Sequence, residues 1–120
     1  MSALLSAIIA GRMRGGSSDS GDYERKSIKE VISGTDVTIT PQDNHEYFCE
    51  STLTSLTITN PNTEGYWIIF FETGNTLPTV TIPASVKFPI NKNLDLEKNA
   101  VHELHVWYGR ALYQAWPVDD

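Results

Sequence analysis

Short runs of alternating apolar and polar residues fill the chain from Thr35 onward, with turn residues between them. Alternation at every second residue is typical of β-strands that bury one face. We expect strands at residues 36–40, 45–50, 52–59, 66–73, 79–83, 85–89, 100–108 and 111–118. The run 66–73 is apolar at both alternating positions, so it is expected to be the most buried strand. About eight short strands predict an all-β fold, an antiparallel β-sandwich or jelly-roll-like domain.

Two prolines interrupt the most strand-like part of the chain, TVTIPASVKFP at residues 79–89. Proline lacks the N–H that the interior of a sheet requires. We therefore expect Pro83 and Pro89 to end short strands at the sheet boundary and to protect an edge from stray pairing. Gly109-Arg110 indicates a tight turn between the last two strands, and no internal sequence repeat is identified.

The N-terminal segment follows a different pattern. Leu4, Leu5, Ile8 and Ile9 recur with the spacing of one helical face, and Met13 extends the apolar set, which predicts a short helix over residues 1–14. An isolated helix of this length is marginal in water, so we expect it to dock on a partner. Its apolar run is too short to span a bilayer, and its arginines follow that run, which argues against a secretory signal.

A linker separates this segment from the strands. Residues 15–22 read GGSSDSGD, a flexible composition, and residues 23–34 fit either a short helix or a lead-in strand, of which we favour the strand. The predicted organisation is an anchor helix at 1–14, a linker and lead-in at 15–33, and a β domain at 34–120.

Charge and cysteine content restrict the range of possible functions. The net charge of −6 argues against binding to a nucleic-acid backbone, which needs clustered Lys and Arg. The acidity belongs to residues 36–120, which carry four basic and eleven acidic residues. Cys49 is the single cysteine, so no intramolecular disulfide can form.

No catalytic motif is present, and the sequence is expected to have no catalytic, cofactor or metal site. His102 and His105 are separated by an odd number of residues, so on a strand they point to opposite faces and cannot share one ion. His45 and Cys49 form a second weak pair, in which Cys49 is more simply a small core residue. The carboxylates are scattered, as on a solvated acidic surface.

The aromatic residues are the best binding candidates, either for a glycan or for another subunit. Adjacent aromatics on a strand must split between its faces, so we expect one core and one outward residue in each adjacent pair. Ordinary core and surface roles are the alternative. The candidates are Tyr66, Trp67, Trp107, Tyr108, Tyr113 and Trp116.

The order of several segments between residues 34 and 118 resembles small β domains of bacteriophage structural proteins, which are widespread in phages and prophages of gut bacteria. The residues that carry the resemblance are Tyr47, Cys49, 53–58, 71–78, 82–88 and Trp116.

This resemblance implies a non-enzymatic virion protein, an appendage of the head-fibre, decoration or tail-associated type. The segment with Leu4, Leu5, Ile8, Ile9 and Met13 would bind a capsid or tail protein. The β domain would self-associate, with a trimer favoured, and the host surface is a further possible contact. The alternative is a carbohydrate-binding module that uses an outward Trp or Tyr.

Overall fold

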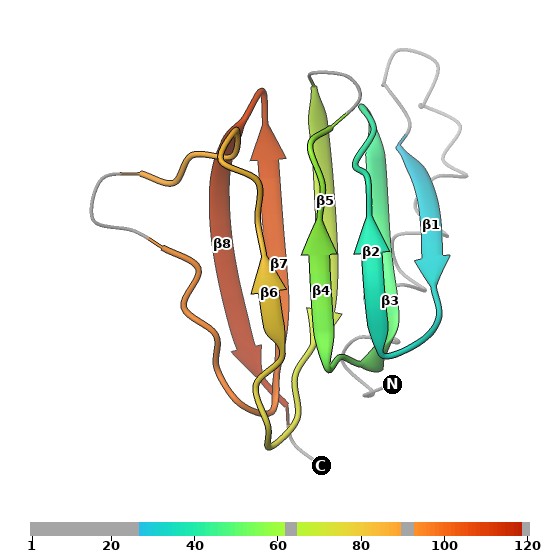
Figure 1. Ribbon diagram of the computed structural model, residues 1–120, viewed down its shortest axis with the longest axis vertical. Helices are drawn as coiled ribbons and strands as arrows, with labels where there is room; N and C mark the ends of the chain where they lie inside the picture. The colour runs from blue at the N-terminus through green and yellow to red at the C-terminus, as the bar shows by residue number, and fades with distance from the viewer. Residues whose placement is uncertain (1–26, 62–64, 90–92, 119–120) are drawn as a thin grey trace, which may run out of the picture.

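The computed structural model describes residues 27–61, 65–89 and 93–118, and this part of the chain contains strands and no helix. Figure 1 shows the strands in two facing layers. The strands are β1 (Ile28–Ile32), β2 (Asp36–Ile39), β3 (His45–Thr52), β4 (Ser55–Ile58), β5 (Tyr66–Glu72), β6 (Thr79–Thr81), β7 (Ala100–Trp107) and β8 (Arg110–Pro117). The expected all-β fold is confirmed.

The chain alternates between the two sheets. The five-stranded sheet has the order β1-β3-β5-β7-β8, and the three-stranded sheet has the order β2-β4-β6. Each of the pairs β1–β2, β3–β4 and β5–β6 therefore crosses once from the large sheet to the small one, which makes three stacked coils (Figure 1). The hairpin of β7 and β8 then completes the large sheet.

The expected antiparallel pairing is wrong for the first six strands. β1, β3 and β5 pair in parallel, as do β2, β4 and β6, and only β5–β7 and β7–β8 are antiparallel. This pairing does not correspond to a jelly roll, which is built from antiparallel strands. Alternation shows which face of a strand is buried, but it is the same in parallel and antiparallel sheets, so it did not reveal the coils.

The coils contain a repeat that the sequence analysis missed. Val37, Leu56 and Val80 are register partners in the three-stranded sheet, as are Thr38, Thr57 and Thr81. The corresponding segments 37–39, 56–58 and 80–82 read VTI, LTI and VTI. The two intervals between them differ because the connecting loops differ in length, so no fixed period appears.

Two further strand predictions are compared with the structure, at residues 85–89 and at the N-terminal edge of the large sheet. Residues 85–89 form no strand, although Lys87 makes an isolated parallel bridge to Arg110. The lead-in strand is confirmed as β1, so the large sheet begins at Ile28, before residue 34, where the β domain was expected to begin.

An apolar core fills the space between the sheets. Trp67, Ile69 and Phe71 project into it from β5, and Leu56 and Ile58 project from β4. Cys49 is confirmed as a core residue, and its burial raises the pKa of its thiol to about 12.

Candidate functional site: the hairpin ridge

A two-residue turn joins β7 to β8. Tyr108 and Gly109 have φ values of 49° and 79°, the left-handed conformations that a type I′ hairpin turn needs at both central positions. The turn therefore lies one residue earlier than the predicted Gly109-Arg110. Trp107 and Arg110 become the last cross-strand pair of the hairpin.

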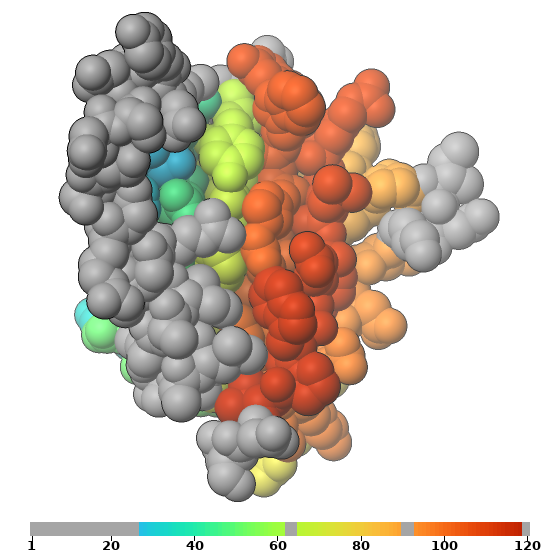
Figure 2. Space-filling model, turned by 180° about the vertical axis from the view of Figure 1, so that it is seen from behind, coloured from blue at the N-terminus to red at the C-terminus, as the bar shows by residue number. Residues whose placement is uncertain are grey.

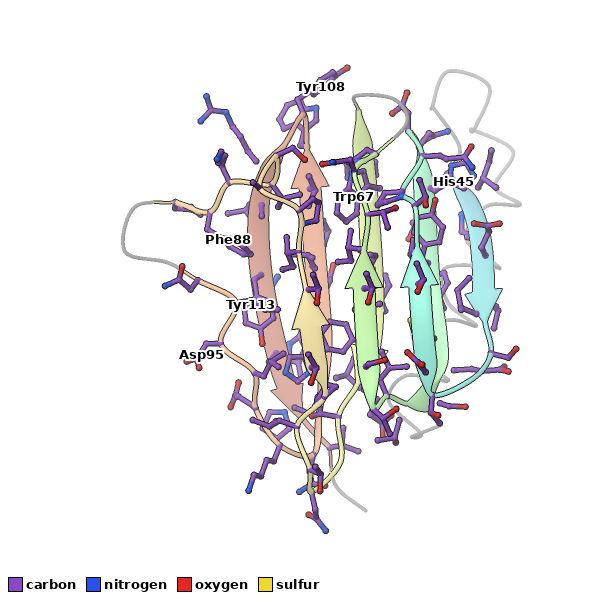
Figure 3. The ribbon with its side chains drawn as sticks, in the orientation of Figure 1. His45, Trp67, Phe88, Asp95, Tyr108 and Tyr113 are labelled. Carbon is purple, nitrogen blue, oxygen red and sulfur yellow. The ribbon has the colours of Figure 1, made fainter. Side chains whose placement is uncertain are left out.

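Large apolar side chains gather on this hairpin without cover. Trp107 is 67 %, Leu112 66 % and Tyr108 60 % exposed. Trp107, Arg110 and Leu112 lie on the face of the large sheet that points away from the small sheet, because their neighbours Val106 and Ala111 belong to the core between the sheets. We call Trp107, Tyr108, Arg110 and Leu112 the hairpin ridge. Figure 2 shows the molecule from this side, and Figure 3 labels Tyr108 at the end of the hairpin.

The ridge lies between two hollows. One has a volume of about 470 Å³ and is lined by Asn44, Tyr66 and His105 in addition to ridge residues. The other has a volume of about 370 Å³ and is lined on its far side by Lys87, Phe88 and Pro89. Figure 3 shows Phe88 beside the β8 edge of the large sheet. The ridge thus offers an apolar crest with concave surface on both sides.

Polar groups line the first hollow. His105 pairs with Glu103 on the same face of β7, and the ring of Tyr66 lies 6.5 Å from the ring of His105 at an angle of 57°. Arg110 adds an exposed guanidinium from the neighbouring strand. Aromatic rings beside an arginine are the composition that protein interfaces favour.

The expected split of adjacent aromatics holds for one pair and fails for the other. Trp67 is buried in the core while Tyr66 lies on the opposite face, as predicted. Trp107 and Tyr108 are both exposed, because Tyr108 belongs to the turn and the alternation of the strand ends before it.

The remaining aromatic candidates are partly buried. Tyr113 packs against the core between the sheets, and its hydroxyl donates a hydrogen bond to the carbonyl oxygen of Asp95 at 2.6 Å. Burial raises the pKa of this phenol. Trp116 packs on the outer face of the large sheet. Trp67 and Tyr113 are therefore structural, and the exposed aromatic candidates are Trp107 and Tyr108 of the ridge, whereas Tyr66 and Trp116 are partly buried.

Arg110 and Leu112 are site residues that the sequence analysis missed. Ala111, Leu112 and Tyr113 are three consecutive apolar residues, so alternation did not show which one points outward. Placing the turn correctly would have assigned Leu112 to the face of Trp107.

The histidines lie as their spacing predicted. His102 is fully buried and stacks on Phe71 with ring centroids 4.8 Å apart, whereas His105 lies on the opposite face. No group of three or more potential metal ligands occurs within residues 27–61, 65–89 and 93–118, and those residues hold no helix long and apolar enough to cross a membrane. The predicted anchor residues Leu4, Leu5, Ile8, Ile9 and Met13 lie outside the described residues.

In comparisons with known proteins, no family model, curated protein or solved structure matches the chain.

Proposed function

We propose that this protein is a structural component of a bacteriophage particle, an appendage that joins the particle through residues 1–14 and associates with copies of itself through the hairpin ridge. A trimer is the favoured assembly. The virion setting rests on the order of segments between residues 34 and 118 that resembles phage β domains.

The exposure of the ridge carries the proposal. Trp107, Tyr108 and Leu112 are each at least 60 % exposed and lie within one hairpin. A contiguous exposed apolar surface on a small domain is a mark of a contact site, and isolated exposed residues are not. The concave surface on both sides of the ridge could accept the crest of a neighbouring copy.

The coils suit a scaffolding role. Within each sheet the parallel strands are joined by ladders of backbone hydrogen bonds, interrupted between β3 and β5 by a register shift after Phe48, and the three coils stack on one another as the repeats of a solenoid do. The β7–β8 hairpin lies at one end of this stack (Figure 1), and its ridge is the surface to which we assign self-association.

Native mass tests the proposal. Sedimentation equilibrium of the full chain at micromolar concentration should give a trimer, and Leu112→Asp should give a monomer because a charge in an apolar contact is costly. Leu77→Asp is the matched control, since Leu77 is 40 % exposed in the loop between β5 and β6, lines neither hollow beside the ridge and should keep the trimer. A monomeric wild-type chain, or an unchanged mass for Leu112→Asp, would contradict self-association through the ridge.

Glycan binding is the second candidate, and the hollow beside Trp107 favours it. The Trp107 ring is exposed, and Tyr66, His105, Asn44 and Arg110 line the same hollow with polar and aromatic groups. Such a surface can stack on a sugar and hydrogen-bond to its hydroxyls. Saturable binding by a monomer to an immobilised glycan, lost in Trp107→Ala and kept in Trp116→Phe, would select this function over self-association.

A further inference from the structure

The outer face of the large sheet carries a second apolar cluster. Phe48 on β3, Ile68 and Phe70 on β5, and Val101 on β7 form it, and none of the four is more than 1 % exposed. The Phe48 and Phe70 rings stack with centroids 5.0 Å apart. This cluster is separate from the core, because it lies on the opposite side of the sheet from Trp67 and Ile69.

Only a second layer can bury this cluster so completely. Side chains on one face of a sheet stand roughly perpendicular to it, so lateral neighbours leave their tips accessible. Among the described residues, the partly buried apolar neighbours of the cluster are Tyr66, Trp116 and Val118, which belong to the large sheet and its C-terminal continuation. The described residues that pack against the cluster thus flank it within the plane of the sheet.

The same face buries three carboxylates. Glu46, Glu72 and Glu103 are each less than 10 % exposed and alternate in register with the apolar cluster. Lys29 lies 3.6 Å from the Glu46 carboxylate, and His105 pairs with Glu103. A covering layer that combines an apolar stripe with positive charge would therefore complement both the apolar cluster and the negative charge of this face.

We propose that residues 2–14 of the same chain are this covering layer. Leu4, Leu5, Ile8 and Ile9 supply a stripe of the required apolar character, and Arg12 and Arg14 follow it immediately. The stripe lies on the Phe48–Phe70 cluster, and the arginines approach the buried carboxylates.

The dimensions fit this arrangement. A helix over these residues is about 20 Å long at 1.5 Å per residue, close to the roughly 19 Å that separates the first and last strands of a five-stranded sheet. The linker 15–26 can extend to about 40 Å, so it can lead from the start of β1 to any part of the outer face. In the free chain, the segment proposed to bind the particle is then held on its own sheet.

Nuclear Overhauser contacts test the proposal directly on the full chain, which is small enough for solution NMR. We expect contacts from the methyl groups of Ile8 and Ile9 to the rings of Phe48 and Phe70. A sample that mixes labelled and unlabelled chains should show these contacts within one chain only. Methyl groups without contacts to the sheet, or contacts found only between chains, would overturn the proposal.

A pair of charge insertions provides a second test. Ile8→Asp places a carboxylate in the apolar stripe and should lower the melting temperature by roughly 5 to 10 °C. Ala10→Asp inserts the same charge on the opposite side of the predicted helix and should change it by less than about 2 °C. Equal effects of the two variants would overturn the proposal. This inference concerns the free chain and stands or falls separately from self-association through the ridge, because Leu112→Asp leaves the apolar stripe intact.

Discussion

Truncating Leu56 to alanine should be one of the most destabilising changes in the chain. Leu56 is fully buried at the centre of the three-stranded sheet, between its register partners Val37 and Val80. Its side chain points across the core toward the large sheet. Leucine-to-alanine changes at buried sites cost about 3 to 5 kcal/mol, and the cost is highest where the surroundings cannot collapse into the cavity. The parallel ladders on both sides of β4 limit that collapse, so we expect about 4 kcal/mol, or a fall in melting temperature of roughly 15 to 25 °C.

Urea denaturation, followed by the fluorescence of the buried Trp67, measures this effect. Leu112→Ala is the matched control, since the same truncation at a residue that is 66 % exposed should cost less than about 0.5 kcal/mol in a monomeric sample. A loss of less than about 1.5 kcal/mol for Leu56→Ala would refute the packing of the small sheet against the large one.

Two further predictions follow from the coils and the core. The double variant Thr38→Cys/Thr57→Cys should form a disulfide on mild oxidation, because these residues are register partners on parallel strands and lie within bonding range. The double variant Thr38→Cys/Thr59→Cys should not form one. Reversed efficiencies on a non-reducing gel would contradict the parallel register. Burial lowers the pKa of His102 below its ordinary value of 6.5, so the unfolded state binds the proton more readily and the free energy of unfolding decreases as the pH is lowered below about 6.5. His102→Phe should flatten this dependence in urea titrations between about pH 7 and 5, and parallel slopes for the two proteins would contradict it.

Strand positions could be predicted from the sequence, and strand partners could not. Alternation located β2, β3, β4, β6 and both strands of the final hairpin to within a few residues, and a continuous apolar run located β5. It gave no information on direction, and the VTI, LTI and VTI segments recur at unequal intervals, so the parallel coils stayed hidden. Recognising a repeated three-residue core motif, with loops of different length between the copies, would have exposed them.

The sequence predicted two of the four residues of the hairpin ridge and missed the other two, because the turn was placed one residue too late. Trp107 and Tyr108 were identified as candidates because they are aromatic, but their exposure depends on where the turn begins. A shift of one residue moved Arg110 into the ladder and placed Leu112 on the outer face. Small errors in turn placement therefore have large effects on which side chains a hairpin displays.

Burial on both faces of β5 was predicted correctly, and it requires a covering layer on each face of the large sheet. Ile68 and Phe70 on one face are as buried as Ile69 and Phe71 on the other. Such a strand needs a layer on each side, and the small sheet supplies only one. The second layer is the role that we assign to the N-terminal segment.

The accessibility of Trp107 in the assembled protein shows whether the chains associate through the hairpin ridge. Iodide quenching of the wild-type chain, compared with Trp107→Phe, isolates this residue from the core Trp67 and the partly buried Trp116. We expect Trp107 to be quenched at concentrations where the chain is monomeric and to become protected over the same range in which the native mass rises. If the mass rises while Trp107 stays as accessible as in the monomer, the chains associate through another surface and the hairpin ridge is not the contact.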